Sequence, residues 1–354
     1  MTETMRALRK AGPGPGAELV EVPVPEPGEG EVRLRVHGAS LCGTDLHIYE
    51  WNDWAASRIP NLPMTFGHEV AGTVEAVGSE VHHLASGDFV AAETHIVCGR
   101  CSTCRTGRAH ICENLRILGV DTEGAFAERV VIPAQNAWVV GEGIDPDVAS
   151  IMEPFGNGVH ATFGTEGGED LATNPVAVLG CGPIGLFACG IARAAGAFKV
   201  IAVEPNDYRR RLAERMGADL VVDPAERDPV EAVHEATGGT GAEVVLEMSG
   251  NARAIDQGTR MLARGGRMSL LGLPEGPVTL DLNDQVIFKE ARILGITGRE
   301  MFRTWQQTTT LLSTGRVDVT PVITHRFPLE RFADAFEVAA SGRSGKVLIL
   351  PGIG

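Results

Sequence analysis

Residues 175–204 read PVAVLGCGPIGLFACGIARAAGAFKVIAVE, and this stretch decides the fold of the middle of the chain. An apolar run is followed by a glycine-rich turn, a segment with helical periodicity and a second apolar run. Further short apolar runs follow (DLVVD, EVVLEMSG, RMSLLG and RILGITG), and helical segments such as YRRRLAERMGA lie between such runs. Strands and helices that alternate in this way predict an α/β domain with a parallel sheet covered by helices on both faces.

The turn after the first apolar run, GCGPIG, has glycine at its first, third and sixth positions. Gly180 permits the tight turn, Gly182 lets a pyrophosphate approach the backbone, and Gly185 lets the following helix pack closely on the strand. The N-terminus of that helix offers free N–H groups and a positive dipole end to phosphates. The pattern favours a dinucleotide site, and a purely structural strand-to-helix turn is the alternative.

The second apolar run ends at Glu204, where an acid accepts hydrogen bonds from an adenosine ribose. A carboxylate there also repels a 2′-phosphate, so NAD is favoured over NADP. Arg209 opens the next helix and is placed to lie along the adenine. The alternatives are a solvated strand end for Glu204 and an ordinary surface arginine for Arg209.

The chain has 354 residues, enough for about two domains. Its 46 acidic and 31 basic residues leave a formal charge of −15, which disfavours nucleic-acid and membrane-surface partners. We find no apolar run long enough to span a membrane and no secretory signal, so we expect a cytoplasmic protein.

The pattern of apolar and polar residues at the two ends of the chain differs from that in its middle. From Met5 to about Gly87, alternating apolar residues are broken by proline and glycine, which suits an antiparallel barrel. Near the C-terminus, EMFRTWQQTTTLLSTGRV is predicted helical, and VTPVITHRFPL and KVLILP are predicted strands without a further crossover unit. The tail therefore returns to complete the first domain. We expect one domain from 1–153 and 296–354 and a second from 154–295, with a packed hinge in SIMEPFGNGVHATFG.

Four of the seven cysteines lie close together, at Cys98, Cys101, Cys104 and Cys112. Four thiolates at such spacing can surround a tetrahedral zinc ion and leave no position open for a substrate, which is typical of a structural site. Two disulfides or an iron–sulfur cluster are the alternatives.

A second, dispersed set consists of Cys42 and the adjacent pair His68 and Glu69, with Glu153 as a later acid. A lone cysteine is usually a small buried hydrophobe, and a lone histidine is usually a satisfied core residue. Taken together, however, these residues have the composition of a catalytic zinc site with room for one exchangeable ligand.

The segment GHEVAGTVEAVG at 67–78, the four-cysteine loop and the GCGPIG turn occur in this order, and together they resemble the zinc-dependent medium-chain alcohol dehydrogenases. The resemblance runs from about Met5 to Leu350. Within that family, CGTDLHIYEWNDW, AETHIVCGRC, EPFGNGVH, GREMFRTW and PVITHRF are similar to the members that oxidise threonine.

The resemblance implies a GroES-like catalytic domain, a Rossmann domain, two zinc ions per subunit and a homotetramer. It assigns the catalytic zinc to Cys42, His68 and Glu69 and the structural zinc to the four-cysteine loop. Besides the turn glycines, it places these residues at the NAD site: Ile184, Glu204, Arg209, Leu271, Gly272, Leu273, Ile296 and Thr297.

The reaction so implied is oxidation of the secondary hydroxyl of L-threonine by NAD to 2-amino-3-oxobutanoate. Thr44 and His47 are placed to pass the hydroxyl proton on, and Glu153 is placed to face the substrate's ammonium or tune the proton path. Arg299 either faces the carboxylate or braces a domain or subunit contact. The alternatives are a zinc-dependent dehydrogenase of polyols such as sorbitol or 2,3-butanediol, and a non-catalytic dinucleotide-binding protein.

Overall fold

The computed structural model describes residues 3–59, 61–165 and 167–352. The chain divides into two compact units, the first made of Met1–Glu153 with Ile323–Gly354 and the second of Pro154–Val322. In this division the chain returns to the first unit later than the 295/296 boundary expected from the sequence, so helix α10 (Arg303–Ser313) falls in the second unit. Among the described residues, none of the helices has the length and apolar character that a membrane crossing requires.

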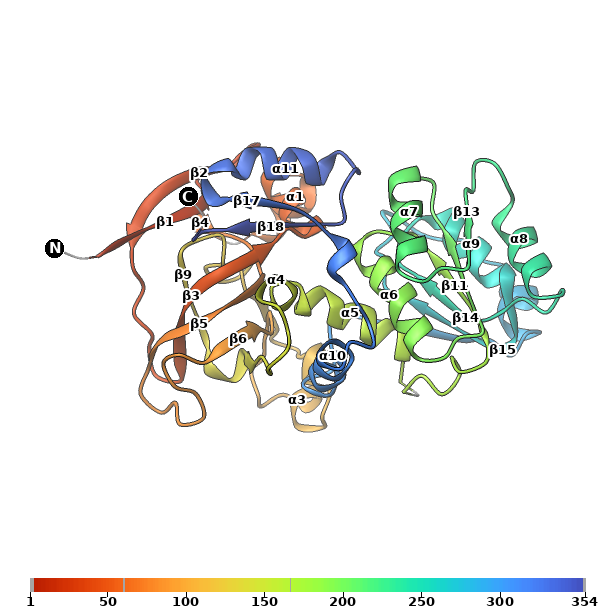
Figure 1. Cartoon of the computed structure of the whole chain (residues 1–354), viewed down its shortest axis with the longest axis horizontal. Coiled ribbons are helices and arrows are strands. Elements are labelled where there is room, and N and C mark those ends of the chain that lie inside the picture. Colours follow the sequence, from red (N-terminus) through yellow and green to blue (C-terminus); the bar gives the residue numbers. More distant parts are fainter. Residues whose placement is uncertain (1–2, 60, 166, 353–354) are drawn as a thin grey trace. The chain divides into compact units, whose positions relative to one another are not determined.

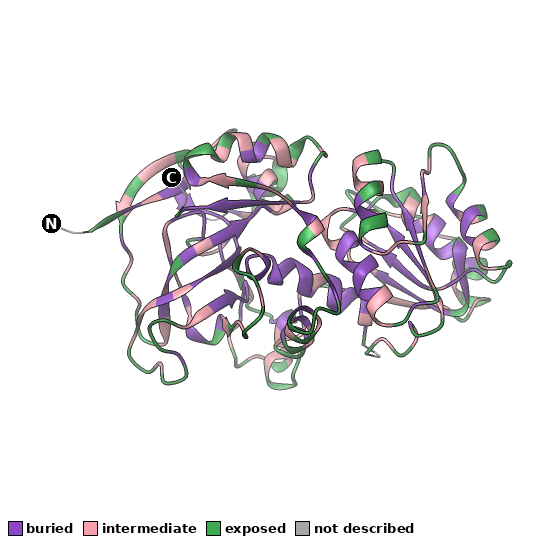
Figure 2. Cartoon of the chain, in the orientation of Figure 1, coloured by how far each residue is buried: buried purple, intermediate pink, exposed green. Residues whose placement is uncertain are grey.

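The second unit holds a parallel sheet, in which every neighbouring pair of strands runs in the same direction. Its strand order is β13 (Leu220–Val222), β12 (Lys199–Val203), β11 (Pro175–Leu179), β14 (Ala242–Glu247), β15 (Leu262–Leu270) and β16 (Arg292–Gly295). The helices between these strands are α6 (Pro183–Ala194), α7 (Asp207–Arg215), α8 (Pro229–Ala236) and α9 (Ala252–Met261). Four of the five residues of β11 and of β12 are buried, because helices cover the sheet (Figure 2). The predicted α/β architecture is confirmed.

Polar residues at the carboxyl ends of the strands start the helices of this unit. The side-chain oxygen of Asn206 accepts the N–H groups of Tyr208 and Arg209 and so caps α7. Asn251 caps α9 in the same way. Such caps satisfy donors that a helix leaves free in its first turn, so each helix begins directly beside the end of its strand.

The first unit is built on a largely antiparallel sheet. The order of its strands is β10 (Ala137–Val139), β6 (Phe89–Ala92), β5 (Glu69–Val77), β3 (Glu31–Ser40), β18 (Lys346–Leu350) and β17 (Ile323–Pro328), with β9 (Arg129–Pro133) also on β3. The smaller pairings involve β1 (Thr4–Lys10), β2 (Glu18–Pro23) and β4 (Met64–Thr65), and β7 (His95–Ile96) with β8 (Arg116–Ile117). The helices assigned wholly to this unit are α1 (Gly43–Glu50), α2 (Asp53–Arg58), α3 (Ser102–Arg105), α4 (Pro146–Ala149) and α11 (Phe332–Ala340).

The C-terminal strands correct one expectation from the sequence. β17 and β18 pair in parallel, and helix α11 connects them, so the tail does contain a crossover unit. Parallel neighbours cannot be joined by a tight hairpin, which is why the segment FADAFEVAA forms a helix between them. β18 then pairs antiparallel with β3, which brings the end of the chain beside its beginning (Figure 1). The tail thus belongs to the first unit.

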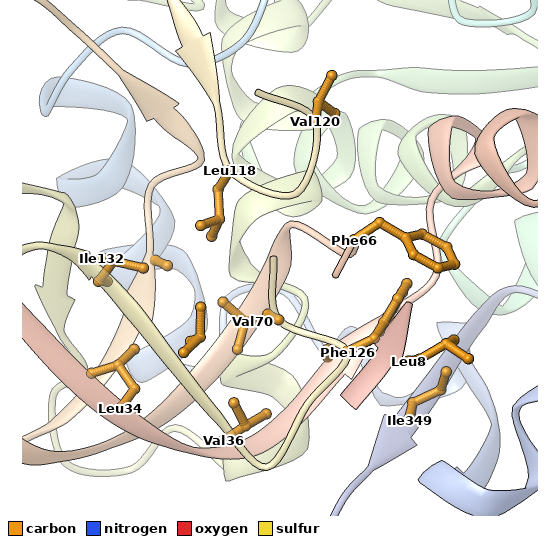
Figure 3. Close-up of a cluster of buried hydrophobic side chains, with 14 of the residues drawn as sticks. Leu8, Leu34, Val36, Phe66, Val70, Leu118, Val120, Phe126, Ile132 and Ile349 are labelled. Carbon is orange, nitrogen blue, oxygen red and sulfur yellow. The ribbon is translucent and has the colours of Figure 1, made fainter. Parts of the chain in front are cut away.

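The core of the first unit joins residues from both ends of the chain. Figure 3 shows Ile349 of β18 beside Leu8 of β1, and both are buried. Phe66 and Phe126 pack edge to face at a centroid distance of 5.2 Å. The boundary between the units falls inside helix α5 (Met152–Phe163), so the expected hinge segment is a continuous helix.

Candidate metal and nucleotide sites

The four-cysteine loop of the first unit brings its sulfur atoms together. The Sγ atoms of Cys98, Cys101, Cys104 and Cys112 all lie within 4.8 Å of one another. Cys112 Sγ is 3.5 Å from Cys98 Sγ and 3.8 Å from Cys101 Sγ. Zinc–sulfur bonds of ~2.3 Å in a tetrahedron separate sulfurs by about 3.8 Å, whereas a disulfide needs ~2.05 Å. All four are free thiols, so the geometry fits a zinc ion and not two disulfides.

The protonation of these thiols also indicates a cation site. A hydrogen bond with the Thr103 hydroxyl, aided by backbone N–H groups, lowers the pKa of Cys101 to about 5. Desolvation and hydrogen bonds with Cys101 and Cys112 raise the pKa of Cys104 to about 12. Cys101 is therefore ionised at neutral pH, whereas Cys104 stays protonated. A divalent cation among them would let all four ionise together.

The second ligand set is assembled by the register of two strands. Cys42 follows β3 and caps helix α1, and His68 and Glu69 lie at the start of β5. The antiparallel pairing of β3 with β5 sets Glu69 opposite Ser40, two residues before Cys42. The ligand atoms of Cys42, His68 and Glu69 lie within 4.8 Å of one another, and His68 and Glu69 are buried.

Negative charge converges on His68 in this site. Asp45 is fully buried, accepts the Cys42 N–H through Oδ2 at 2.8 Å, and places Oδ1 3.5 Å from His68 Nδ1. Burial by itself lowers the pKa of His68, but attraction to Asp45 and Cys42 holds that pKa well above its usual value. Asp45 Oδ1 and His68 Nδ1 are both buried without a hydrogen-bond partner. One thiolate, one imidazole and one carboxylate in such a potential fit a zinc ion.

The residues expected to handle the proton differ in their surroundings. Thr44 is half-buried on α1, and His47 is exposed on the same helix with its Nδ1 2.9 Å from the Asn52 side-chain nitrogen. Glu153 is buried at the start of α5 and lies outside the group of three ligand atoms. Their catalytic roles stay predictions.

Each glycine of the nucleotide turn meets a distinct requirement. Gly180 has a φ of +87°, which favours glycine, and a Cβ at Gly185 would lie 1.9 Å from the carbonyl oxygen of Gly180. A Cβ at Gly182 would meet no atom within 4 Å, so its surroundings are open. Two glycines thus serve the packing of the turn, and the third leaves space above it.

That space belongs to a cavity of about 620 Å³ in the second unit, lined by Gly180, Gly182, Glu204 and Arg209 among others. The buried carboxylate of Glu204 accepts N–H groups of Cys181 at 2.6 Å and Asn206 at 2.9 Å. The Nε of Arg209 is buried without a hydrogen-bond partner. A cavity that contains both an acid and an unsatisfied guanidinium nitrogen fits an adenosine moiety.

The other residues expected at this site follow the strands nearby. Leu271, Gly272 and Leu273 come directly after β15, and Ile296 and Thr297 come directly after β16. Parallel strands end at the same edge of the sheet, which is where ligands of such folds bind. Leu273 is 90% exposed and lines a neighbouring cavity of about 430 Å³. Ile184 lies in the first turn of α6.

Comparison with known proteins gives two family models and many relatives. The models are the alcohol dehydrogenase GroES-like domain over residues 28–142 and the zinc-binding dehydrogenase over residues 183–314. An L-threonine 3-dehydrogenase of Bacillus subtilis (strain 168) is 51% identical over 320 residues, which cover 90% of this chain and 91% of that protein. This chain belongs to the zinc-binding dehydrogenase family.

Two further relatives of this dehydrogenase cover nearly the whole chain. An L-threonine 3-dehydrogenase of Symbiobacterium thermophilum is 50% identical over 352 residues, with 99% of each chain covered. A solved structure from Escherichia coli CFT073, described as a short-chain alcohol dehydrogenase complexed with NADH, has a TM-score of 0.88 and 27% identity and covers 98% of this chain and 99% of that one. The family expected from the sequence motifs is confirmed.

Sequence reasoning missed several residues of these sites. In the dehydrogenase's metal site these are Asp45, which lies inside the motif CGTD, and Ser40 and Lys346, whose side chains reach Glu69. Asp45 could have been found, because a buried acid three residues from a ligand is a common partner for metal-bound histidines. No local signal marks Lys346, which reaches the site through the pairing of β18 with β3. At the cavity, Ser249 and Asn251 were also missed.

Arg299 is almost completely buried in the second unit, where its guanidinium donates to Asn157 Oδ1 at 3.0 Å. Its side chain also packs on Gly156, because a Cβ there would lie 2.8 Å from Arg299 Cδ. These contacts lie within the second unit, and both expected roles of Arg299 stay predictions.

Proposed function

We propose that this dehydrogenase oxidises the secondary hydroxyl of L-threonine with NAD, which yields 2-amino-3-oxobutanoate, NADH and a proton. The observation that carries the proposal is the convergence of Cys42, His68 and Glu69 in a chain whose second unit presents an open dinucleotide turn. The substrate class is supported by relatives named L-threonine 3-dehydrogenase that are about half identical over 90% or more of the chain.

The proposed metal ions are held by residues of the first unit, and the cofactor is held by residues of the second. Cys42, His68 and Glu69 would hold the catalytic zinc ion, and the four-cysteine loop would hold the structural one. When bound, the catalytic zinc ion supplies positive charge that favours loss of the substrate's hydroxyl proton, and NAD supplies the acceptor for the hydride. Asp45 orients His68 and Cys42 for this purpose through its two carboxylate oxygens.

The second unit selects and orients the cofactor. The open backbone at Gly182 and the start of α6 receive the pyrophosphate, because their N–H groups and helix dipole favour an anion. Glu204 accepts the ribose hydroxyls and repels a 2′-phosphate, which favours NAD over NADP. Arg209 places its unsatisfied Nε against the adenosine.

The protons are handled by residues of the first unit. Thr44 takes the hydroxyl proton, because a hydroxyl can accept and donate at once, and His47 releases it to water from its exposed position. Glu153 presents a buried negative charge to the ammonium of threonine. His47 is thus the solvent end of the path.

We also place the dehydrogenase in the cytoplasm and as a homotetramer. β16 lies at the end of the described sheet of the second unit, and the segment before it exposes the large apolar side chains of Leu282, Ile287 and Phe288. Exposed apolar side chains beside an unpaired strand edge are typical of a subunit contact. Light scattering coupled to gel filtration measures the subunit number directly.

The test of the activity is a substrate panel followed by NADH absorbance. Purified enzyme with NAD is offered L-threonine, D-threonine, L-serine, 2,3-butanediol and sorbitol. L-threonine is expected to give the highest kcat/KM, and the Cys42→Ser variant should lose turnover while it still binds NADH. A higher kcat/KM for a polyol would show that the enzyme is a polyol dehydrogenase and not a threonine dehydrogenase. If none of the compounds gives NADH, the result would support a non-catalytic role.

A further inference from the structure

Lys346 is buried within the catalytic metal site, although it lies far from the ligands in sequence. It is 2% exposed and begins β18, which pairs antiparallel with β3 so that Leu348 lies opposite Ser40. Its Nζ donates to Glu69 Oε2 and, at 2.9 Å, to the carbonyl oxygen of Leu41. The ammonium is therefore hydrogen-bonded to the residue before one metal ligand and to the side chain of another.

Glu69 is bound asymmetrically as a result. The hydroxyl of Ser40 donates to the same Oε2 that receives Lys346, so this oxygen has two donors. A carboxylate oxygen has two lone pairs in its plane, and both are then occupied. Oε1 is the oxygen that these two donors leave available to a metal ion.

The charges of the site give Lys346 a second effect. The side chain of Lys346 forms a buried ion pair with the carboxylate of Glu69. The thiolate of Cys42 and the carboxylate of Glu69 would together cancel the charge of a divalent ion, and the buried carboxylate of Asp45 adds a further negative charge beside His68. The ammonium of Lys346 offsets part of this negative charge beside the ligands.

We propose that Lys346 is a positioning residue that restricts Glu69 to one metal-facing oxygen and withdraws part of its negative charge from the zinc ion. This proposal rests on the proposed zinc site. Its consequence is that the ammonium weakens zinc retention and keeps positive charge for the substrate's hydroxyl. Removing Lys346 should then tighten zinc binding and slow turnover at the same time.

The test is a measurement of zinc retention that needs neither threonine nor NAD. The full-length zinc-loaded enzyme is titrated with a chromophoric chelator, and the Cys42→Ser variant identifies which of the two ions belongs to this site. We expect Lys346→Met to hold this ion roughly ten- to hundredfold more tightly, the range over which residues around ligands change metal affinity. Lys346→Arg keeps the charge and should remain close to the wild type.

A matched control is Lys10→Met in the same unit. Lys10 is 1% exposed, and its Nζ donates to backbone carbonyls, among them those of Gly16 at 2.8 Å and Tyr49 at 3.1 Å. Its replacement removes a buried ammonium of similar type away from the ligands, so zinc retention should not change. A fall in stability shared by both methionine variants would measure the general cost of losing a buried lysine.

Cobalt substitution supplies a spectroscopic readout. Loss of the ammonium frees one lone pair of Glu69 Oε2 while Ser40 still donates to the other, so Co²⁺ at this site should gain a ligand, and its d–d absorption should weaken relative to the wild type and to Lys346→Arg. If Lys346→Met does not fold, Ser40→Ala decides, because it frees one lone pair of Oε2 and should tighten zinc in the same direction by a smaller factor.

The proposal is overturned if Lys346→Met holds zinc as strongly as the wild type or more weakly, because a purely structural lysine gives that result. If Lys346→Met does not fold, the same result for Ser40→Ala overturns the proposal. An enzyme that prefers another alcohol would end the threonine assignment and leave the zinc measurement intact. The two failures are therefore distinguishable.

Discussion

Alanine at Gly182 and at Gly185 should produce opposite defects. At Gly185 the new Cβ would lie 1.9 Å from the carbonyl oxygen of Gly180 and 3.0 Å from its carbon, so helix and turn must separate by more than 1 Å. Overpacking of backbone against backbone costs about 3 kcal/mol or more, which lowers the melting temperature by roughly 6–12 °C.

At Gly182 the same methyl group meets no protein atom within 4 Å, and the backbone φ of −61° suits alanine. The free energy of unfolding should stay level or rise by about 0.4–1 kcal/mol, because the unfolded chain loses freedom. The methyl group would instead occupy the place of the pyrophosphate, and a clash of about 1.4–2.8 kcal/mol weakens NADH binding roughly ten- to hundredfold.

Thermal unfolding and titration with NADH, measured on both variants, separate the two effects. Gly182→Ala should melt with the wild type and bind NADH poorly, while Gly185→Ala should melt early. The reasoning is refuted if Gly182→Ala melts as early as Gly185→Ala, or if it binds NADH within about twofold of the wild type.

Three more outcomes are expected. Burial raises the pKa of Asp121, but hydrogen bonds from Arg58 and the Ile117 N–H and the charge of Arg58 outweigh burial and lower it. These interactions therefore stabilise the fold above the pKa of the unfolded carboxyl, and their contribution is lost as pH falls through the pKa of the folded carboxyl. Acid unfolding of Arg58→Leu, followed by circular dichroism, should begin at a higher pH than that of the wild type. After a chelator has removed the metal, Cys101 should be alkylated before Cys104 at neutral pH, because the pKa is about 5 for Cys101 and about 12 for Cys104. Mass spectrometry at early time points measures the order of alkylation, and the reverse order would contradict the prediction. His47→Asn should depress turnover most on the acid side of neutrality and leave NADH binding unchanged, and an unaltered pH profile would remove His47 from the proton path.

Much of the candidate site could be predicted because its chemistry is local in sequence. The spacing of the four cysteines and of the turn glycines determines what a short loop can surround, and the structure places both sets as such loops require. The crossover through α11 was missed because FADAFEVAA is short, and its helix depends on the parallel pairing that it connects. The second domain boundary differs from the expected one because α10 gives no sign in its own sequence of the unit to which it belongs.

The sequence by itself determined the family, and it predicted the two metal ligand sets and the preference for NAD from residue types within short motifs. Tertiary structure alone decided what surrounds those groups. The pairing of β18 with β3 brings Lys346 beside Glu69, and the register of β3 with β5 brings Ser40 there as well. Neither the segment around Lys346 nor the segment around Glu69 shows by its own sequence that the two lie together, because only the pairing of distant strands brings them into contact. A buried lysine is stable only where a partner such as Glu69 is present.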